Sequence, residues 1–85
     1  MWLDVIGGCI KGRNTKSLDL SAGSSLADCK RACESEKDFK CRSIDYGVSQ
    51  RKCHLSGDNR ESAESDYLQN CASKDYVYSE IIQGW

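Results

Sequence analysis

Residues 29–53 read CKRACESEKDFKCRSIDYGVSQRKC and contain four of the six cysteines of the chain. The first two, Cys29 and Cys33, are spaced by one helical turn, so a helix would place both on the same face. The runs 41–46 and 52–56 have strand-like composition and are separated by a short loop that contains glycine. We therefore expect a helix followed by a β-hairpin, with both helical cysteines directed at the sheet and bonded to partners there.

The helix is predicted to begin directly after Ser25. This serine is a suitable N-cap, and Asp28 three residues later gives a variant of the capping box with an acidic first turn. Side chains spaced three and four residues apart form its expected inward face. They are Leu26, Cys29, Ala32 and Cys33.

Three further runs are predicted as strands. Residues 2–6 are rich in apolar side chains and end at a Gly-Gly pair, residues 17–20 form a second short run, and residues 76–82 have high strand propensity. The polar stretch 60–70 is compatible with a helical turn or an irregular loop. The sum is an α+β fold in which one helix packs on a small antiparallel sheet.

The length and the cysteine content indicate one small disulfide-bonded domain. A chain of 85 residues forms a single unit, here residues 1–85, and its core is small for the surface it must cover. Cysteines in an even number supply the covalent links that such a core needs, and they indicate an oxidising compartment. Six cysteines allow 15 pairings. They are Cys9, Cys29, Cys33, Cys41, Cys53 and Cys71.

Secretion is therefore expected from the cysteines alone. The first residues, MWLDVI, lack the basic n-region and the apolar run of a signal peptide, so we expect any signal peptide to lie outside this sequence. No stretch of the sequence approaches the roughly 20 apolar residues that span a bilayer.

The order of the cysteines resembles that of the PAN/apple family. An early Cys9 is followed by the Cys29-x3-Cys33 helix, the runs CRSIDY (41–46) and CHLS (53–56), and a late Cys71. The resemblance covers most of the chain, about residues 9–82, and implies the family's disulfide-linked helix and hairpin. It also implies the pairs Cys9–Cys71, Cys29–Cys53 and Cys33–Cys41.

The same resemblance implies a function. PAN/apple domains are noncatalytic extracellular modules that serve adhesion, protein docking or carbohydrate binding. We accordingly expect a recognition module whose partner is a glycan or an extracellular protein. The alternative is a purely architectural or protein-docking unit within a larger multidomain secreted protein.

Other chemistry is not expected from the composition. A net charge of −1 gives the whole chain no reason to bind nucleic acid or an anionic membrane. Zinc would require two tight cysteine pairs, and catalysis would require a free thiol or a paired acid and base. The single histidine, His54, is interpreted as an ordinary surface residue. We expect no enzyme activity, no metal and no cofactor.

Two groups of side chains are candidates for ligand contact. Arg42 and Tyr46 share one face of their strand, and Tyr76 and Tyr78 share one face of theirs, so an aromatic and guanidinium cluster on the open sheet face is one possibility. The other is that these tyrosines form core under the helix. With Arg51 of the hairpin loop, the candidate ligand-binding residues are Arg42, Tyr46, Arg51, Tyr76 and Tyr78.

Basic residues occur in three small groups that could contact an acidic glycan, although acidic neighbours favour an ordinary solvated surface. The groups are Lys11, Arg13 and Lys16, then Lys30 and Arg31, and finally Arg51 and Lys52. Trp2 and Trp85 lie near the two ends of the chain. They are equally compatible with buried ends and with a dimer contact.

Overall fold

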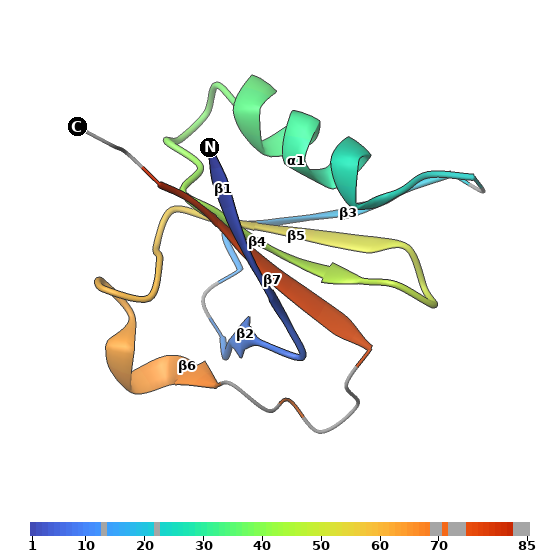
Figure 1. Ribbon diagram of the computed structural model, residues 1–85. Helices are drawn as coiled ribbons and strands as arrows, with labels where there is room; N and C mark the ends of the chain where they lie inside the picture. The colour runs from blue at the N-terminus through green and yellow to red at the C-terminus, as the bar shows by residue number, and fades with distance from the viewer. Residues whose placement is uncertain (13, 22, 69–70, 72–74, 83–85) are drawn as a thin grey trace.

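A computed structural model describes residues 1–12, 14–21, 23–68, 71 and 75–82. Among these residues, one α-helix lies across one face of a five-stranded sheet, and a separate sheet of two short strands lies across the other face (Figure 1). The elements are β1 (Trp2–Ile6), β2 (Cys9–Ile10), β3 (Lys16–Asp19), α1 (Leu26–Ser35), β4 (Ser43–Gly47), β5 (Lys52–Ser56), a 3-10 helix (Glu64–Asp66), β6 (Tyr67–Leu68) and β7 (Tyr76–Ile81).

The main sheet has five antiparallel strands in the order β1-β7-β4-β5-β3. The α+β prediction and the hairpin are confirmed, since β4 and β5 pair directly with Tyr46 opposite Cys53. Strands β1 and β5 have the predicted bounds, whereas β3, β4 and β7 differ from the predicted runs by one or two residues at one or both ends. Such shifts are ordinary at strand ends.

The helix begins at Leu26 as predicted, with Ser25 as its N-cap. The backbone N–H of Ser25 donates to a carboxylate oxygen of Asp28 at 2.8 Å, which is half of a capping box. Hydrogen bonding to Ser25 and the nearby Arg31 guanidinium hold the pKa of the Asp28 carboxyl below its usual value.

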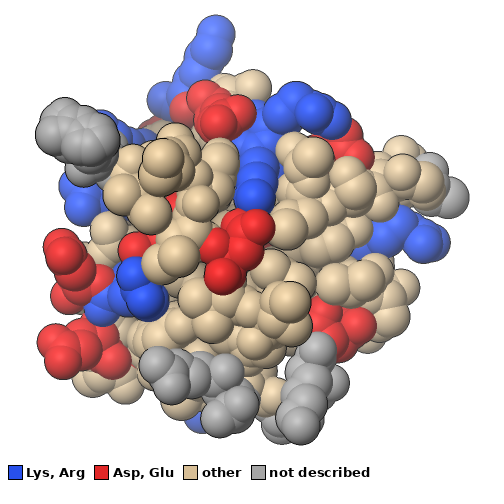
Figure 2. All heavy atoms as spheres, in the orientation of Figure 1, with Lys and Arg blue, Asp and Glu red and all other residues tan. Residues whose placement is uncertain are grey.

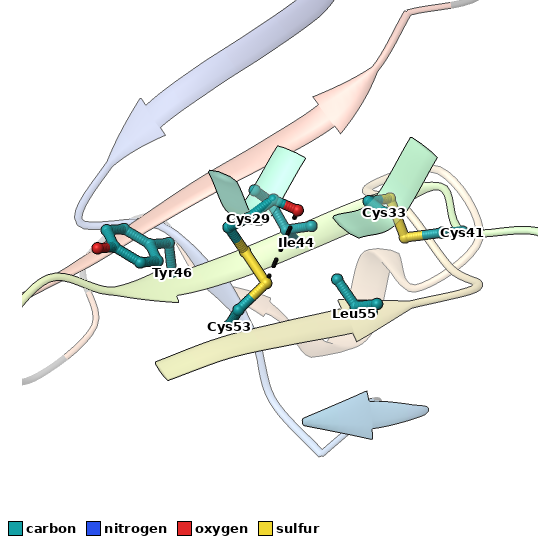
Figure 3. Close-up of a cluster of buried hydrophobic side chains, with 7 residues drawn as sticks. All are labelled: Cys29, Cys33, Cys41, Ile44, Tyr46, Cys53 and Leu55. Atoms are coloured by element: carbon teal, nitrogen blue, oxygen red, sulfur yellow. Dashed lines mark hydrogen bonds between the residues drawn. A yellow bond between two sulfur atoms is a disulfide. The ribbon is translucent and has the colours of Figure 1, made fainter. Parts of the chain in front are cut away.

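The core beneath the helix is built around two disulfides (Figure 3). Cys29 and Cys53 are both 0% exposed, and Ile44 and Leu55 pack beside them. Because neighbouring residues of a strand point to opposite faces, Ile44 and Tyr46 of β4 both face the helix. All three disulfides implied by the resemblance are present: Cys9–Cys71, Cys29–Cys53 and Cys33–Cys41.

A second layer covers part of the opposite sheet face. Strands β2 and β6 pair there, and Ile10 and Ala63 pack on the fully buried Tyr78. The sequence predicted a helical turn or an irregular loop for residues 60–70. The 3-10 helix confirms the helical turn, whereas β6 was not expected. A two-residue strand has too little pattern to be recognised locally. The Cys9–Cys71 disulfide joins β2 to the chain that follows β6.

Close packing between the two layers makes Gly8 sensitive to substitution. A Cβ atom at Gly8 would lie 3.1 Å from side-chain atoms of Tyr78 and Val5 and 3.2 Å from the Tyr67 hydroxyl. We expect Gly8→Ala to lower the free energy of unfolding by about 1–3 kcal/mol, as overpacking does. The matched control is Gly57→Ala, whose Cβ would lie at ordinary contact distances of 3.6 Å and 3.7 Å. Equal stability of the two variants in urea unfolding would contradict this packing.

Candidate ligand-binding site

A hollow of about 300 Å³ lies where β7 ends and β4 begins. The residues that line it carry a guanidinium, an amide, two carboxylates and two aliphatic side chains, and one of the aliphatic residues, Ile81, also packs against the core beneath the helix. The lining residues are Cys41, Arg42, Asn59, Glu61, Glu80, Ile81 and Ile82. Concave sites with a few convergent polar groups are where small ligands bind most often.

Glu80 is the fixed polar group of this hollow. Its carboxylate accepts hydrogen bonds from Nε and Nη2 of Arg60, both at 3.0 Å, and from the Tyr78 hydroxyl at 2.7 Å. Burial by itself raises the pKa of Glu80, but the hydrogen bonds from Arg60 and Tyr78 outweigh it and leave the pKa below its ordinary value. The carboxylate is therefore ionised and held in one orientation.

A second hollow, of about 330 Å³, adjoins the first. It shares Glu61 and Glu80 with the first hollow and adds Arg60, Glu64 and Tyr67. The guanidinium of Arg60 lies 6.0 Å from the centre of the Tyr67 ring. Arg60 is thus fixed by both neighbours.

Arg42 is the only one of the five predicted ligand-binding residues that lines the first hollow. Its backbone is held on both sides, because its N–H donates to the carbonyl of Ser56 at 2.8 Å and its carbonyl accepts from Ile81 at 2.9 Å. The Arg42 residue itself is exposed. A rigid backbone carrying an exposed guanidinium is well arranged to contact a ligand.

Tyr46 and Tyr78 do not form the open-face cluster that the sequence suggested. Tyr46 is buried beneath the start of the helix, where its hydroxyl donates to the carbonyl of Ser24 at 3.4 Å. Tyr78 is 0% exposed and lies on the opposite sheet face under Ile10 and Ala63. The alternative of a core position under the helix is confirmed for Tyr46, but Tyr78 is core in the other layer. The second layer is the reason, since it closes the face that the sequence left open.

Tyr76 and Arg51 lie near the hairpin turn, away from Arg42. The Tyr76 ring is half-buried, lies 6.1 Å from the His54 ring and would contact any side chain placed at Gly47. Arg51 is exposed in the turn with a φ of 53°, a left-handed conformation that residues other than glycine seldom adopt. Arg42 and Arg51 flank opposite ends of β4.

The sequence suggested that His54 is an ordinary surface residue, but the structure shows that it is only partly exposed. It is half-buried on the sheet face opposite the helix, and its Nδ1 lies 2.7 Å from the Ser17 hydroxyl. Burial, and next the neighbouring Lys52, hold the pKa of the imidazole below its usual value. Its contact with Ser17 fixes the ring as part of the sheet surface.

The basic groups predicted from the sequence are largely neutralised. Lys16 lies 2.8 Å from Glu36, Lys30 lies 2.9 Å from Asp4, and Lys52 lies 2.9 Å from Asp19. Arg31 pairs with Asp28. Figure 2 shows blue and red side chains interspersed on this face of the molecule. This mixed surface is the ordinary solvated surface that the acidic residues near each basic group predicted. Arg13 and Trp85 lie outside the described residues.

No cluster of three or more metal-ligating side chains occurs among the residues that the structure describes. The helix in the described part of the chain is too short and polar to cross a membrane. The hollow beside Glu80 is therefore the leading candidate site. Sequence reasoning missed four residues of the two hollows: Asn59, Arg60, Glu61 and Glu80. The first three follow β5 and Glu80 lies in β7, and no spacing in the sequence indicates that these two segments are neighbours.

A disulfide-linked helix and sheet with an exposed polar hollow define a small binding module. The model of the PAN domain family matches residues 4–83, which is nearly the whole chain, and the chain belongs to this family. PAN domains are noncatalytic modules that bind proteins or carbohydrates.

Proposed function

We propose that this chain is an extracellular recognition module that binds carbohydrate in the hollow between Arg42 and Glu80. The observation that carries the proposal is the composition of the hollow: residues that carry a guanidinium, an amide and two carboxylates line it together with Ile81 and Ile82. Sugar hydroxyls both donate and accept hydrogen bonds, and sugar C–H groups pack on aliphatic side chains. A wall that offers both kinds of contact suits such a ligand.

The rigid frame supports tight binding despite the small size of the hollow. Glu80 is fixed by Arg60 and Tyr78, and the Arg42 backbone is held between β5 and β7. A site that is already ordered loses little conformational entropy when it binds its ligand. The three disulfides preserve this order in the oxidising environment that they indicate.

The test is a glycan array probed with the oxidised module, followed by calorimetry on the sugars that bind. Arg42→Ala should weaken binding by about 10- to 100-fold, because a hydrogen bond to a charged group is lost. Arg51→Ala is the matched control, since it removes an exposed arginine at the far end of β4 and should leave the affinity within about twofold. Failure of the folded protein to bind any neutral, sialylated or sulfated glycan would exclude this proposal.

Protein docking is the second candidate, and the exposed polar rim of the hollow is compatible with it. A protein partner would lose affinity in Arg42→Ala as well, but an excess of free saccharide would not displace it. A purely architectural role within a longer secreted protein predicts that the isolated module binds neither sugar nor protein. These three outcomes are distinguishable in one competition experiment.

A further inference from the structure

The two edges of the five-stranded sheet differ in chemistry. Strand β3 at one edge reads KSLD, and its charged side chains Lys16 and Asp19 form ion pairs. Strand β1 at the other edge reads WLDVI, with Asp4 as its one charged residue, and Ile6 is 83% exposed. Charged residues on an edge strand prevent pairing with another chain. Only the β3 edge is well protected in this way.

Strand β1 pairs only with β7 in the five-stranded sheet (Figure 1), so part of its backbone is unpaired along the outer edge. The N–H of Gly7 donates to Tyr76 at 2.7 Å, and Met1 accepts from Ile82 at 2.9 Å. Along an antiparallel strand, successive residues direct their backbone N–H and C=O groups alternately to the two sides. The backbone groups of Leu3 and Val5 therefore point toward β7, as do those of Met1 and Gly7. Those of Trp2, Asp4 and Ile6 point away from the sheet. Within the described ranges, no backbone hydrogen bond reaches them.

We infer that β1 pairs antiparallel with β1 of a second copy of this chain, with the two-fold axis at Asp4. In this register Trp2 lies opposite Ile6 of the second copy, and Leu3 lies opposite its Val5. Every outward residue then faces another outward residue, so the backbone groups of all three are satisfied. A shift by two residues either way would place Asp4 opposite Trp2 or Ile6 and shorten the ladder. The strand is therefore complementary to itself in one register.

In this register two like charges, the Asp4 carboxylates, lie opposite each other, and their own cations offset the repulsion. The two Asp4 side chains meet at the axis, and each already has its own cation, since Lys30 lies 2.9 Å from Asp4. The Ser79 hydroxyl also donates to Asp4 at 2.6 Å. Two aspartates and two lysines sum to zero charge. On the same face, the half-buried Trp2, with Lys30 at 5.6 Å from its ring centre, would be covered by the exposed Ile6 of the second copy.

The consequence for function is bivalency. The dimer would form one continuous sheet through both copies, and the hollow beside Glu80 is lined by residues outside β1. The hollow beside Glu80 would remain available in each copy. Two linked sites bind a multivalent surface more tightly than one. The dimer itself does not depend on what the hollow binds.

The test is sedimentation equilibrium from micromolar to millimolar concentration. The wild-type chain should dimerise, and Ile6→Lys should raise the dissociation constant about tenfold or more, because a hydrated charge replaces the apolar contact of Ile6 with Trp2 and lies near Lys30 of the other copy. Val48→Lys is the control: Val48 is also apolar and 49% exposed, but it follows β4 and should leave the dimer unchanged. The exposure of Ile6 makes Ile6→Lys compatible with folding, and thermal unfolding of the variant checks this.

Amide hydrogen exchange gives an independent measurement. Protection of the Asp4 and Ile6 amides should rise with protein concentration, while the Leu3 and Val5 amides are protected throughout. A wild-type chain that stays monomeric at millimolar concentration would overturn the inference. So would a dimer that Ile6→Lys does not weaken, or one in which protection rises along β3 instead.

Discussion

Replacing Cys29 and Cys53 together by alanine is expected to unfold most of the protein at physiological temperature. The disulfide closes a loop with a sequence separation of 24. Loop-closure entropy alone makes its loss worth about 3.5 kcal/mol. Both cysteines are 0% exposed, so the missing sulfur atoms also leave a cavity, which adds about 1–2 kcal/mol. A total of about 5 kcal/mol is comparable to the whole stability of many small domains.

The control is the double variant in which Cys9 and Cys71 are both replaced by alanine. Its disulfide closes a longer loop, with a separation of 62, but Cys9 is only half-buried, and both Cys9 and the buried Cys71 lie outside the core beneath the helix. If loop entropy alone set the stability, this second variant would lose more. Because packing contributes as well, we expect the Cys29 and Cys53 variant to have the lower Tm. The reverse order in calorimetry would show that the core sulfur atoms contribute little beyond loop closure.

The second large effect is expected at Asp45, a buried carboxyl in the centre of the sheet. Asp45 is 7% exposed, and one of its oxygens accepts a hydrogen bond from the N–H of Ile10 at 3.3 Å. The other oxygen has no hydrogen-bond partner among the described residues. Burial raises the pKa of Asp45 to about 7, and the bond from Ile10 offsets only part of this rise.

A raised carboxyl pKa makes the protein more stable as the pH falls. Between pH values near the ordinary pKa of 3.8 and the folded value of about 7, the folded chain binds a proton at Asp45 that the unfolded chain does not. The Asp45 contribution is therefore complete below the lower pKa and is lost as the pH rises through the higher one. Between about pH 8 and pH 5 it should add roughly 2–3 kcal/mol.

Asp45→Asn isolates this effect from other titrating groups. His54 and Tyr78 lie directly opposite Asp45 on the neighbouring strands, and Tyr67 is also close enough to affect it. Burial lowers the pKa of His54, so that residue opposes the trend below neutral pH. The difference between wild type and Asp45→Asn cancels the His54 contribution. Urea unfolding at about pH 8 and pH 5 should show that the stability of Asp45→Asn relative to wild type falls, or changes sign, as the pH falls. The same difference in unfolding free energy at both pH values would contradict a raised pKa.

The local elements of this fold could be predicted because each depends on neighbours in sequence. Cys29 and Cys33 share a helical face through their spacing alone, and Ser25 with Asp28 marks the helix start. The strand bounds of β1 and β5 follow from short apolar runs. The disulfide pairs followed from the cysteine order, through the family that it indicates.

The candidate site could not be predicted in the same way. Arg60 and Glu80 are 20 residues apart, and they meet only because the chain after β5 folds back across β7. The burial of Tyr78 has the same cause, since the layer that covers it includes a strand of two residues and no recognisable pattern. Alternation along β7 correctly placed Tyr76 and Tyr78 on one face. It could not reveal that the second layer buries Tyr78 and leaves Tyr76 half-buried.

By itself, the sequence determined the covalent frame: one helix held to a hairpin by cysteines at helical spacing, in a chain too small to rely on apolar burial alone. The tertiary structure decided which surfaces remain open. Periodicity records which face a side chain occupies, but only the three-dimensional arrangement of the layers determines whether that face meets solvent or a second layer. The exposed Arg42 and the unpaired edge of β1 are therefore products of the fold.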